Sequence, residues 1–297
     1  SGTTPVNLIS FPRPAGRGAM SYLKEKPVAV KLIAVDMDGT FLDSAKRYNK
    51  ARFLRQYAQL KERDIRFVVA SGNQYYQLIS FFPELVDEIA FVAENGGWVV
   101  SGKEDIFNCQ LPTTHFNAVV DHLQTLPHIE IIACGKRSAY TLNSYNDELK
   151  AVAAKYYHRL ELVDDFNHLD DAILKFGLNV PDHLIPEIQP KLHAALGDMV
   201  TAVATGYGSI DLIIPGVHKA NGLRILQERW GIDNHEVVAF GDSGNDIEML
   251  QHAGFGFAMA NAKAEVKAVA SHHAPHNNEE GVLHIIDKVL NREAPFA

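Results

Sequence analysis

Two aspartates, Asp36 and Asp38, follow a short apolar run in the stretch "VKLIAVDMDGT". Desolvating a carboxylate is costly unless a cation or hydrogen-bond donors compensate, so a buried strand is a poor place for unpaired negative charge. The stretch is therefore either an acidic surface turn or a site that holds a cation. A second acidic stretch, "FGDSGND", follows another apolar run and contains Asp242, and this favours the cation site.

Two further stretches, "VVASGN" and "HKANG", bring Ser71 and Lys219 to a strand end and a helix start. In an open parallel sheet, ligands bind in the crevice outside the carboxyl ends of the strands. We therefore expect the four stretches to meet in one crevice.

The expected chemistry is phosphoryl transfer. Asp36 and Asp242 offer hard oxygen ligands that suit Mg²⁺, and Asp36 has a further oxygen that could attack phosphorus to form an aspartyl-phosphate. Mg²⁺ and Lys219 would offset the repulsion between a carboxylate and a phosphate. The hydroxyls of Thr40 and Ser71 and backbone amides of the glycine-bearing turns would hold the phosphate oxygens.

Asp38 lies on the same side of an extended segment as Asp36, while Met37 points away. Asp38 could protonate the leaving alkoxide and later take a proton from water, or it could serve only as a second metal ligand. Asp246 is expected to orient the metal's waters or Lys219 rather than touch phosphate. The remaining predicted phosphate or substrate contacts are Gly72 and, with its role open, Asn245.

The elements that must position these residues alternate along the chain. Apolar runs such as "VKLIAV", "IRFVVAS", "IAFVAEN", "DLIIP" and "VVAFGDS" are interspersed with amphipathic helices, one capped by Asn49 and one ended by Gly231. This alternation predicts an α/β fold: a doubly wound parallel-sheet core formed by residues 20–110 and 208–297. Residues 111–207 carry adjacent strands without intervening helices, which predicts an inserted α+β cap domain.

Three other features are open to two interpretations. In "AILKFGLNV", Lys175, Gly177 and Asn179 share one face of a strand, which is either the cap face toward the substrate or a solvent face. Gln74 and Tyr75 either pack in the core or border the site. The histidines of "SHHAPHNNEEG" suggest a metal cluster, but we favour a loop leading into a helix capped by Asn277 or Asn278.

Composition narrows the function classes. The chain of 297 residues carries a net charge of −8, without the basic clusters of a nucleic-acid binder. No apolar run approaches the roughly 20 residues that span a bilayer. Cys109 and Cys134 lack CxxC spacing, which favours a reduced, cytoplasmic protein. Residues 1–19 are expected to be an added leader before a natural start at Met20, or a native disordered arm.

The four motifs in this order resemble those of the haloacid-dehalogenase superfamily. The insert between the second and third motifs is similar to the Cof-type branch with a C2-class cap, and the similarity runs from about Met20 to the end. It implies Mg²⁺-dependent hydrolysis of small phosphorylated sugars, without an obligate protein partner. By this resemblance Asp36 is the nucleophile, Asp38 the acid/base and a metal ligand through its backbone carbonyl, Ser71 and Lys219 phosphate ligands, and Asp242 a metal ligand.

Two other functions compete with a phosphatase. A phosphotransferase or phosphomutase of the same fold would pass the phosphoryl group to a sugar hydroxyl, and the motifs do not separate it from a hydrolase. A receiver-type signalling module also uses an acidic Mg²⁺ cluster, but it must keep its phosphate and needs neither the leaving-group acid Asp38 nor the large insert.

Overall fold

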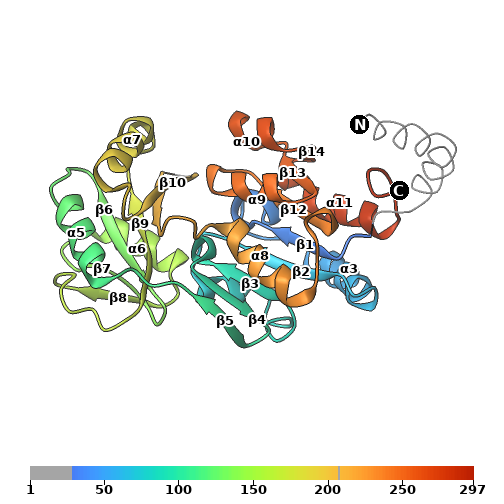
Figure 1. The fold of residues 1–297 in the computed structure, drawn as a ribbon, viewed down its shortest axis with the longest axis horizontal. Coiled ribbons are helices and arrows are strands. Elements are labelled where there is room, and N and C mark those ends of the chain that lie inside the picture. Colours follow the sequence, from blue (N-terminus) through green and yellow to red (C-terminus); the bar gives the residue numbers. More distant parts are fainter. Residues whose placement is uncertain (1–28, 207) are drawn as a thin grey trace, which may run out of the picture.

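A computed structural model describes residues 29–206 and 208–297 of the chain. The expectations for residues 1–19 and for Met20 lie outside these residues. Two units stand side by side, a larger one built from both ends of the chain and a smaller one from its middle (Figure 1).

The larger unit is built on an eight-stranded sheet with the order β14-β13-β12-β1-β2-β3-β4-β5. The strands from β14 to β3 pair in parallel, and β4 and β5 continue the sheet antiparallel. The bounds are β1 (Leu32–Val35), β2 (Arg66–Ala70), β3 (Ala90–Ala93), β4 (Trp98–Ser101), β5 (Glu104–Asn108), β12 (Val237–Gly241), β13 (Phe255–Met259) and β14 (His272–Ala274).

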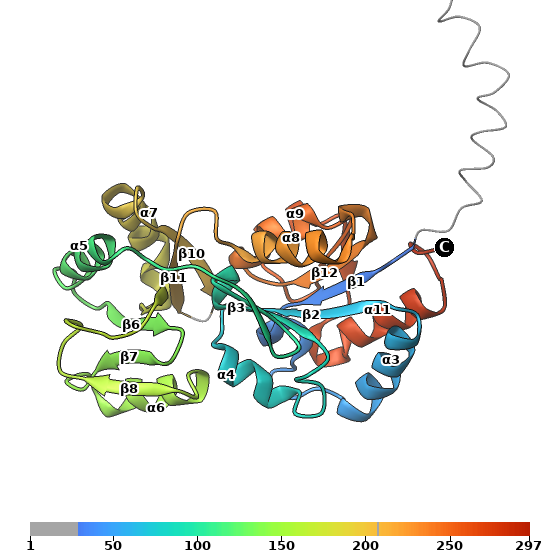
Figure 2. The ribbon, with the colours of Figure 1, turned by 60° about the horizontal axis from the view of Figure 1, so that its bottom comes forward.

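Helices cover both faces of this sheet, as the near-continuous burial of its central strands requires. Figure 2 shows α3 (Lys50–Glu62), α4 (Tyr75–Leu78) and α11 (Gly281–Leu290) on one side and α8 (Lys219–Trp230) and α9 (Ile247–His252) on the other. A further helix, α10 (Ala264–Val269), packs against α9. The expected doubly wound α/β core is confirmed.

The predicted helix boundaries in this unit follow their capping residues. Asn49 accepts a hydrogen bond from the backbone N–H of Arg52 and so caps α3. Gly231 ends α8 in a left-handed conformation, φ 67°, which glycine adopts without steric cost.

The smaller unit is an inserted α+β cap with a six-stranded sheet in the order β10-β11-β9-β6-β7-β8. Helices α5 and α7 share one hydrophobic cluster with the sheet, and α6 packs in a separate cluster with Ile132, Cys134 and Ala139. The bounds are α5 (Thr113–Leu123), β6 (Glu130–Gly135), β7 (Ala139–Leu142), α6 (Asp147–Tyr156), β8 (Leu160–Val163), β9 (Ile173–Asn179), α7 (Ile185–Leu196), β10 (Thr201–Gly206) and β11 (Ser209–Ile213).

The expected end of the cap at residue 207 is too early. The run "DLIIP" belongs to β11, which pairs antiparallel with both β9 and β10 in the cap sheet, so it is not a core strand. Ile210 and Leu212 are fully buried there. A short, fully buried apolar run has the same pattern in either kind of sheet, which is why periodicity alone misplaced it.

The segment after α10 also differs from expectation. His272–Ala274 form the edge strand β14 rather than a loop, and the N-cap of α11 is Glu280 instead of Asn277 or Asn278. The ring of His272 stacks on Phe257 with centroids 5.0 Å apart. Among the described residues, no group of potential metal ligands includes these histidines.

Candidate active site

The four sequence motifs come together where the central strands of the core end. Asp36 follows β1, Ser71 follows β2 and Asp242 follows β12, and these three strands are neighbours. Lys219 is the first residue of α8. All four side chains are buried, as expected for a site at the carboxyl edge of a parallel sheet.

Lys219 lies between two carboxylates. Its Nζ donates to Asp36 Oδ1 at 2.9 Å and to Asp246 Oδ1 at 2.6 Å. The other oxygen of Asp246 accepts hydrogen bonds from the backbone N–H groups of Asp242 and Ser243. Both oxygens of Asp246 are therefore in use, one of them by the ammonium group of Lys219.

Negative charge exceeds positive charge at this point. Carboxylate oxygens of Asp36, Asp242 and Asp246 lie within 4.8 Å of one another, and all three residues are buried. Burial raises the pKa of Asp36 well above its ordinary value, and Asp246 adds to the rise while Lys219 opposes it. Burial likewise raises the pKa of Asp242. A bound cation would relieve this concentration of charge.

The acidic turn places Asp36 and Asp38 differently. Backbone at Asp38 is extended, and the chain then turns at Gly39 with φ 75°. Asp38 accepts hydrogen bonds from Lys46 Nζ at 2.9 Å and Asn73 Nδ2 at 2.8 Å. Met37 points into the core and is fully buried, as the alternation of side chains predicted.

A cavity of about 220 Å³ lies between the core and the cap. From the core it is lined by Asp36, Asp38, Ser71, Gly72, Asn73 and Asn245. From the cap it is lined by Tyr156, Tyr157, Lys175, Gly177, Asn179 and Asp211, among others. The face of β9 that carries Lys175, Gly177 and Asn179 is thus a cavity face.

Thr40, a predicted phosphate contact, is bonded to Asp242 in the structure. Its hydroxyl donates to Asp242 Oδ1 at 2.9 Å, and Thr40 does not line the cavity. This hydrogen bond fixes one oxygen of the Asp242 carboxylate, and contact of Thr40 with phosphate stays a prediction.

Gln74 and Tyr75 do not line the cavity. Gln74 instead exchanges two hydrogen bonds with the backbone of Arg159 in the cap, and Tyr75 packs against Trp98 and Phe91. Gln74 therefore connects the core to the cap, and Tyr75 belongs to the core.

Several residues at the site escaped the sequence analysis. Lys46 and Asn73 hold Asp38, and Glu94, Asn95 and Asp211 form a polar cluster with Lys175. A signal existed for one of them, because Asp211 is a charged residue inside the apolar run "SIDLII". Asn73, Glu94 and Asn95 act through contacts between distant parts of the chain.

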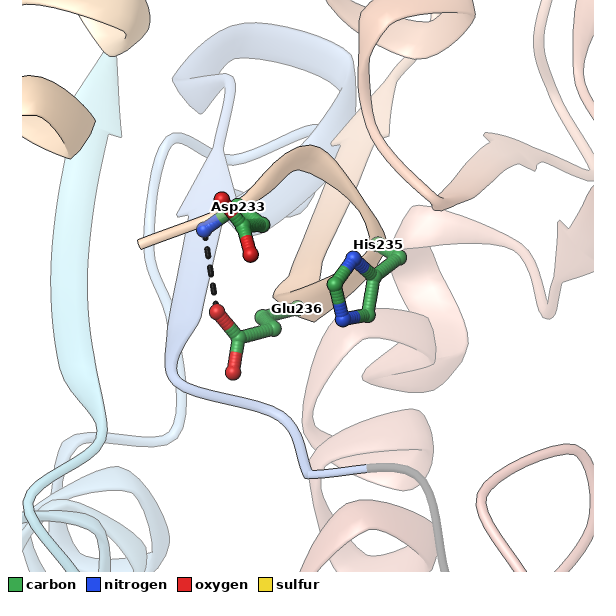
Figure 3. Close-up of side chains that lie close together, drawn as sticks. All are labelled: Asp233, His235 and Glu236. Carbon is green, nitrogen blue, oxygen red and sulfur yellow. Dashed lines mark hydrogen bonds between the residues drawn. The ribbon is translucent and has the colours of Figure 1, made fainter. Parts of the chain in front are cut away.

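A second acidic group in the described part of the chain lies away from this site. Figure 3 shows Asp233, His235 and Glu236 close together at the start of β12. Glu236 accepts from the backbone N–H of Asp233 at 2.9 Å and pairs with Lys31 Nζ at 3.0 Å. Asp233 and Glu236 form a capping box, in which each side chain accepts from the backbone N–H of the other, so the group has a structural explanation.

A parallel α/β core with an aspartate-rich cluster at its strand ends, covered by an inserted cap, defines a capped hydrolase with a doubly wound core. A family model described as haloacid dehalogenase-like hydrolase matches residues 33–286. The chain belongs to this family, which confirms the resemblance seen in its motifs.

Individual proteins similar to this chain include two phosphatases and one protein of known structure. The chain is 65% identical over 269 residues to 5-amino-6-(5-phospho-D-ribitylamino)uracil phosphatase YbjI of Escherichia coli, covering 91% of this chain and 99% of YbjI. It is 27% identical to the similarly named phosphatase YitU of Bacillus subtilis, over 88% of this chain and 97% of YitU. A crystal structure of SMU.1108c from Streptococcus mutans superposes with a TM-score of 0.86 at 37% identity, covering 89% of this chain and all of that one (100%). The protein is therefore a phosphatase of the haloacid-dehalogenase superfamily.

In the described residues, the helices are all too short or too polar to cross a membrane.

Proposed function

We propose that the protein is a Mg²⁺-dependent phosphatase that hydrolyses small phosphorylated sugars or sugar alcohols through an aspartyl-phosphate. The observation that carries this proposal is the position of Asp36, which lies at the floor of the cavity with Lys219 on one oxygen. A buried carboxylate in contact with a buried ammonium group is a suitable nucleophile for a phosphate, because the cation offsets the repulsion between the two anions.

The residues present fit Mg²⁺. Oxygen ligands are the ones that this ion prefers, and Asp36 and Asp242 are buried beside each other. Asn245 Oδ1 is a buried acceptor without a hydrogen-bond partner at the same edge of the cavity. We propose Asp36, Asp242 and the backbone carbonyl of Asp38 as ligands. When bound, the ion would supply positive charge to the phosphate oxygens.

In the proposed reaction, Asp36 acts as nucleophile and Asp38 as acid and then base. A carboxylate oxygen of Asp36 attacks phosphorus, the bond from phosphorus to the leaving oxygen breaks, and Asp38 gives its proton to that oxygen. Asp38 next takes a proton from a water molecule that attacks the aspartyl-phosphate, which releases phosphate and restores Asp36. Ser71 and the backbone at Gly72 line the cavity where the phosphate oxygens would lie.

The substrate class is inferred from the cavity and from the relatives. The cap contributes hydroxyl, amide and charged groups together with aromatic side chains, which suits a polyhydroxylated leaving group. The names of YbjI and YitU specify a phosphorylated ribitylamino compound. We include that compound, which carries a sugar-alcohol chain, among the candidate substrates. The buried free thiols of Cys109 and Cys134 support a cytoplasmic location.

One experiment tests both metal and substrate. Phosphate release is measured on a panel of sugar phosphates, ribitol phosphate derivatives and a small aryl phosphate, with Mg²⁺ and after exhaustive chelation. We expect turnover with Mg²⁺ and its loss after chelation, with recovery when Mg²⁺ is restored. Unchanged turnover after chelation would show that the acidic cluster does not act through a metal.

A further inference from the structure

The turn after β3 connects the two sides of the cavity. Its residues Glu94, Asn95 and Gly96 all have positive φ angles, 54°, 56° and 102°. Such conformations are unfavourable for residues other than glycine and tend to persist where the surroundings over-determine them. The turn is held by backbone hydrogen bonds from Asn95 N to Ser71 O at 2.9 Å and from Glu94 N to Asn73 O at 3.1 Å.

The turn also lies directly against the start of α8. A Cβ atom at Gly96 would be 2.3 Å from the backbone oxygen of His218, the residue before Lys219. The turn is therefore packed between the segment at Ser71, the start of α8 and the cap.

Asn95 uses both ends of its side-chain amide. Its Nδ2 donates to Asp211 Oδ2 in the cap, and its Oδ1 accepts from Asn245 Nδ2 at 3.0 Å. Asp211 is fixed in turn by Lys175, whose Nζ lies 2.7 Å from the same oxygen. All of these groups are buried.

The carboxylate of Asp211, at the cap end of this chain of hydrogen bonds, determines which groups donate and which accept along it. An ionised carboxylate only accepts hydrogen bonds, so Asp211 requires Asn95 to present its N–H groups to the cap. The amide oxygen of Asn95 must then face Asn245, whose Nδ2 donates a hydrogen bond to it. Asn245 Oδ1 is left as an acceptor without a partner at the edge of the cavity.

We propose that Asn95 is a positioning residue that transmits the placement of the cap to the reaction site. It holds the amide of Asn245 in its working orientation only while Asp211 of the docked cap holds Asn95. The proposal rests on the proposed phosphatase function, and it makes docking of the cap a condition for a correctly arranged site.

A double-mutant cycle tests it with purified full-length protein. Asn95→Gly removes the amide and suits the left-handed backbone, whereas alanine would strain it. We expect Asn95→Gly to lower kcat on the preferred sugar phosphate about 10-fold with little change in KM, since misplaced groups lose orientation rather than binding. Asn245→Ala is the partner variant, and thermal unfolding checks that each variant folds.

The cycle separates a relay from two independent effects. If Asn95 acts through Asn245, adding Asn95→Gly to Asn245→Ala should lower kcat by less than about 2-fold more, because coupled sites are not additive. Losses that simply multiply would overturn the proposal. Asn108→Gly is the matched control: its amide oxygen contacts Lys136 of the cap away from the cavity, and it should leave kcat within about 2-fold of the wild type.

A second variant keeps the test informative if Asn95→Gly is unstable. Asn95→Asp has the same size and can still accept from Asn245, but it faces Asp211 with a carboxylate oxygen. We expect it to lose kcat as well, and wild-type kcat in this variant would overturn the relay. The failure of the proposed function would look different, because the wild-type protein would then release no phosphate from any phosphomonoester.

Discussion

Asp36 and Asp38 are two residues apart, but their side chains have different surroundings. Asp36 is buried against Lys219 and close to two other carboxylates. Asp38 lies on the cavity wall and is held by Lys46 and Asn73 from two different segments. The first position suits a group that forms a covalent bond, and the second suits a group that moves protons at the leaving oxygen.

This difference predicts unequal effects of the same substitution. Asp36→Asn should fall to near background, because an amide is a poor nucleophile and weakens the metal site. Asp38→Asn should keep more activity, since acid–base assistance is worth roughly 10² to 10⁴-fold, and should keep most on aryl phosphates that need little protonation. The aspartyl-phosphate should accumulate in Asp38→Asn with such substrates.

Mass spectrometry of the acid-quenched Asp38→Asn protein would locate the added phosphoryl group on the peptide that contains Asp36. A phosphoryl group on another residue, or full activity of Asp36→Asn, would remove the nucleophile assignment.

Glu94 is a second residue whose environment has a measurable consequence. Neither of its carboxylate oxygens has a hydrogen-bond partner, and the nearest cation is Lys175 Nζ at 3.8 Å. Burial raises the pKa of Glu94 to about 7 from an ordinary value of 4.5, although Lys175 opposes the rise. Between these two pH values the folded protein binds a proton that the unfolded chain does not.

The stability of the protein should therefore decrease as pH rises from about 4.5 to about 7, because the unfolded state binds fewer protons. Glu94→Gln removes this titration and should reduce the decrease by an amount on the order of 3 kcal/mol. Urea unfolding of both proteins at pH 5 and pH 8 measures it. Glu62→Gln, on the exposed face of α3, is the matched control, and equal pH dependence in all three proteins would contradict the assignment.

At the scale of elements, β9 decides what the cap presents to the cavity. Lys175, Gly177 and Asn179 alternate along it and line the cavity, while Phe176 packs in the cap core against Phe116. There is no space at Gly177, since a Cβ atom there would be 2.7 Å from the hydroxyl of Tyr157. The strand thus presents three different positions to the cavity: the ammonium group of Lys175, Gly177 without a side chain, and the exposed amide of Asn179.

Asn179 is the clearest position at which to test selectivity. Lys175→Ala would leave Asp211 buried without its cation, which typically costs about 3–5 kcal/mol. A loss of activity in that variant would then be hard to separate from a loss of folding. Asn179 is exposed and bonded to Glu130, so Asn179→Ala should be tolerated. We expect it to change the ranking among sugar phosphates more than the hydrolysis of a small aryl phosphate. Equal loss on every substrate in steady-state assays would argue against a role in selectivity.

The sequence predicts most elements but not all of their partners. The core strands before Asp36, Ser71 and Asp242 follow from local pattern, and the helices capped by Asn49 and ended by Gly231 follow from capping chemistry. The assignment of β11 failed because burial of a short run does not reveal which sheet it joins. The site residues Asn95 and Asp211 were missed for a similar reason: they meet across 116 positions of sequence, and no local pattern encodes such a contact.

At the scale of the whole molecule, the cap is also attached to the core away from the cavity. Gln74 donates to the backbone oxygen of Arg159 at 2.8 Å and accepts from its N–H at 3.0 Å. The guanidinium of Arg159 lies 3.6 Å from the centre of the Tyr76 ring, whose hydroxyl donates to Lys136 O at 3.0 Å. These contacts fix the β7–β8 side of the cap against the start of α4.

Loss of Gln74 should loosen this attachment without unfolding either unit. We expect Gln74→Ala to increase amide hydrogen exchange at Arg159, because its N–H loses its acceptor, and to cost about 1–3 kcal/mol for the buried groups left unpaired. Hydrogen-exchange mass spectrometry on peptides of β8 measures the change. Gln59→Ala, exposed on α3, is the control, and unchanged exchange in Gln74→Ala would show that the contact is not needed for cap docking.

The tight packing at Gly96 affects how tolerance to substitution at this position should be interpreted. Gly96 carries no charge and does not line the cavity, but the main chain of His218 occupies the space that any side chain would need. A survey of tolerated substitutions should therefore find position 96 as intolerant as Asp36. Constancy at these two positions would record different things: at Asp36 it would record the reaction, and at Gly96 only the close approach of two backbones.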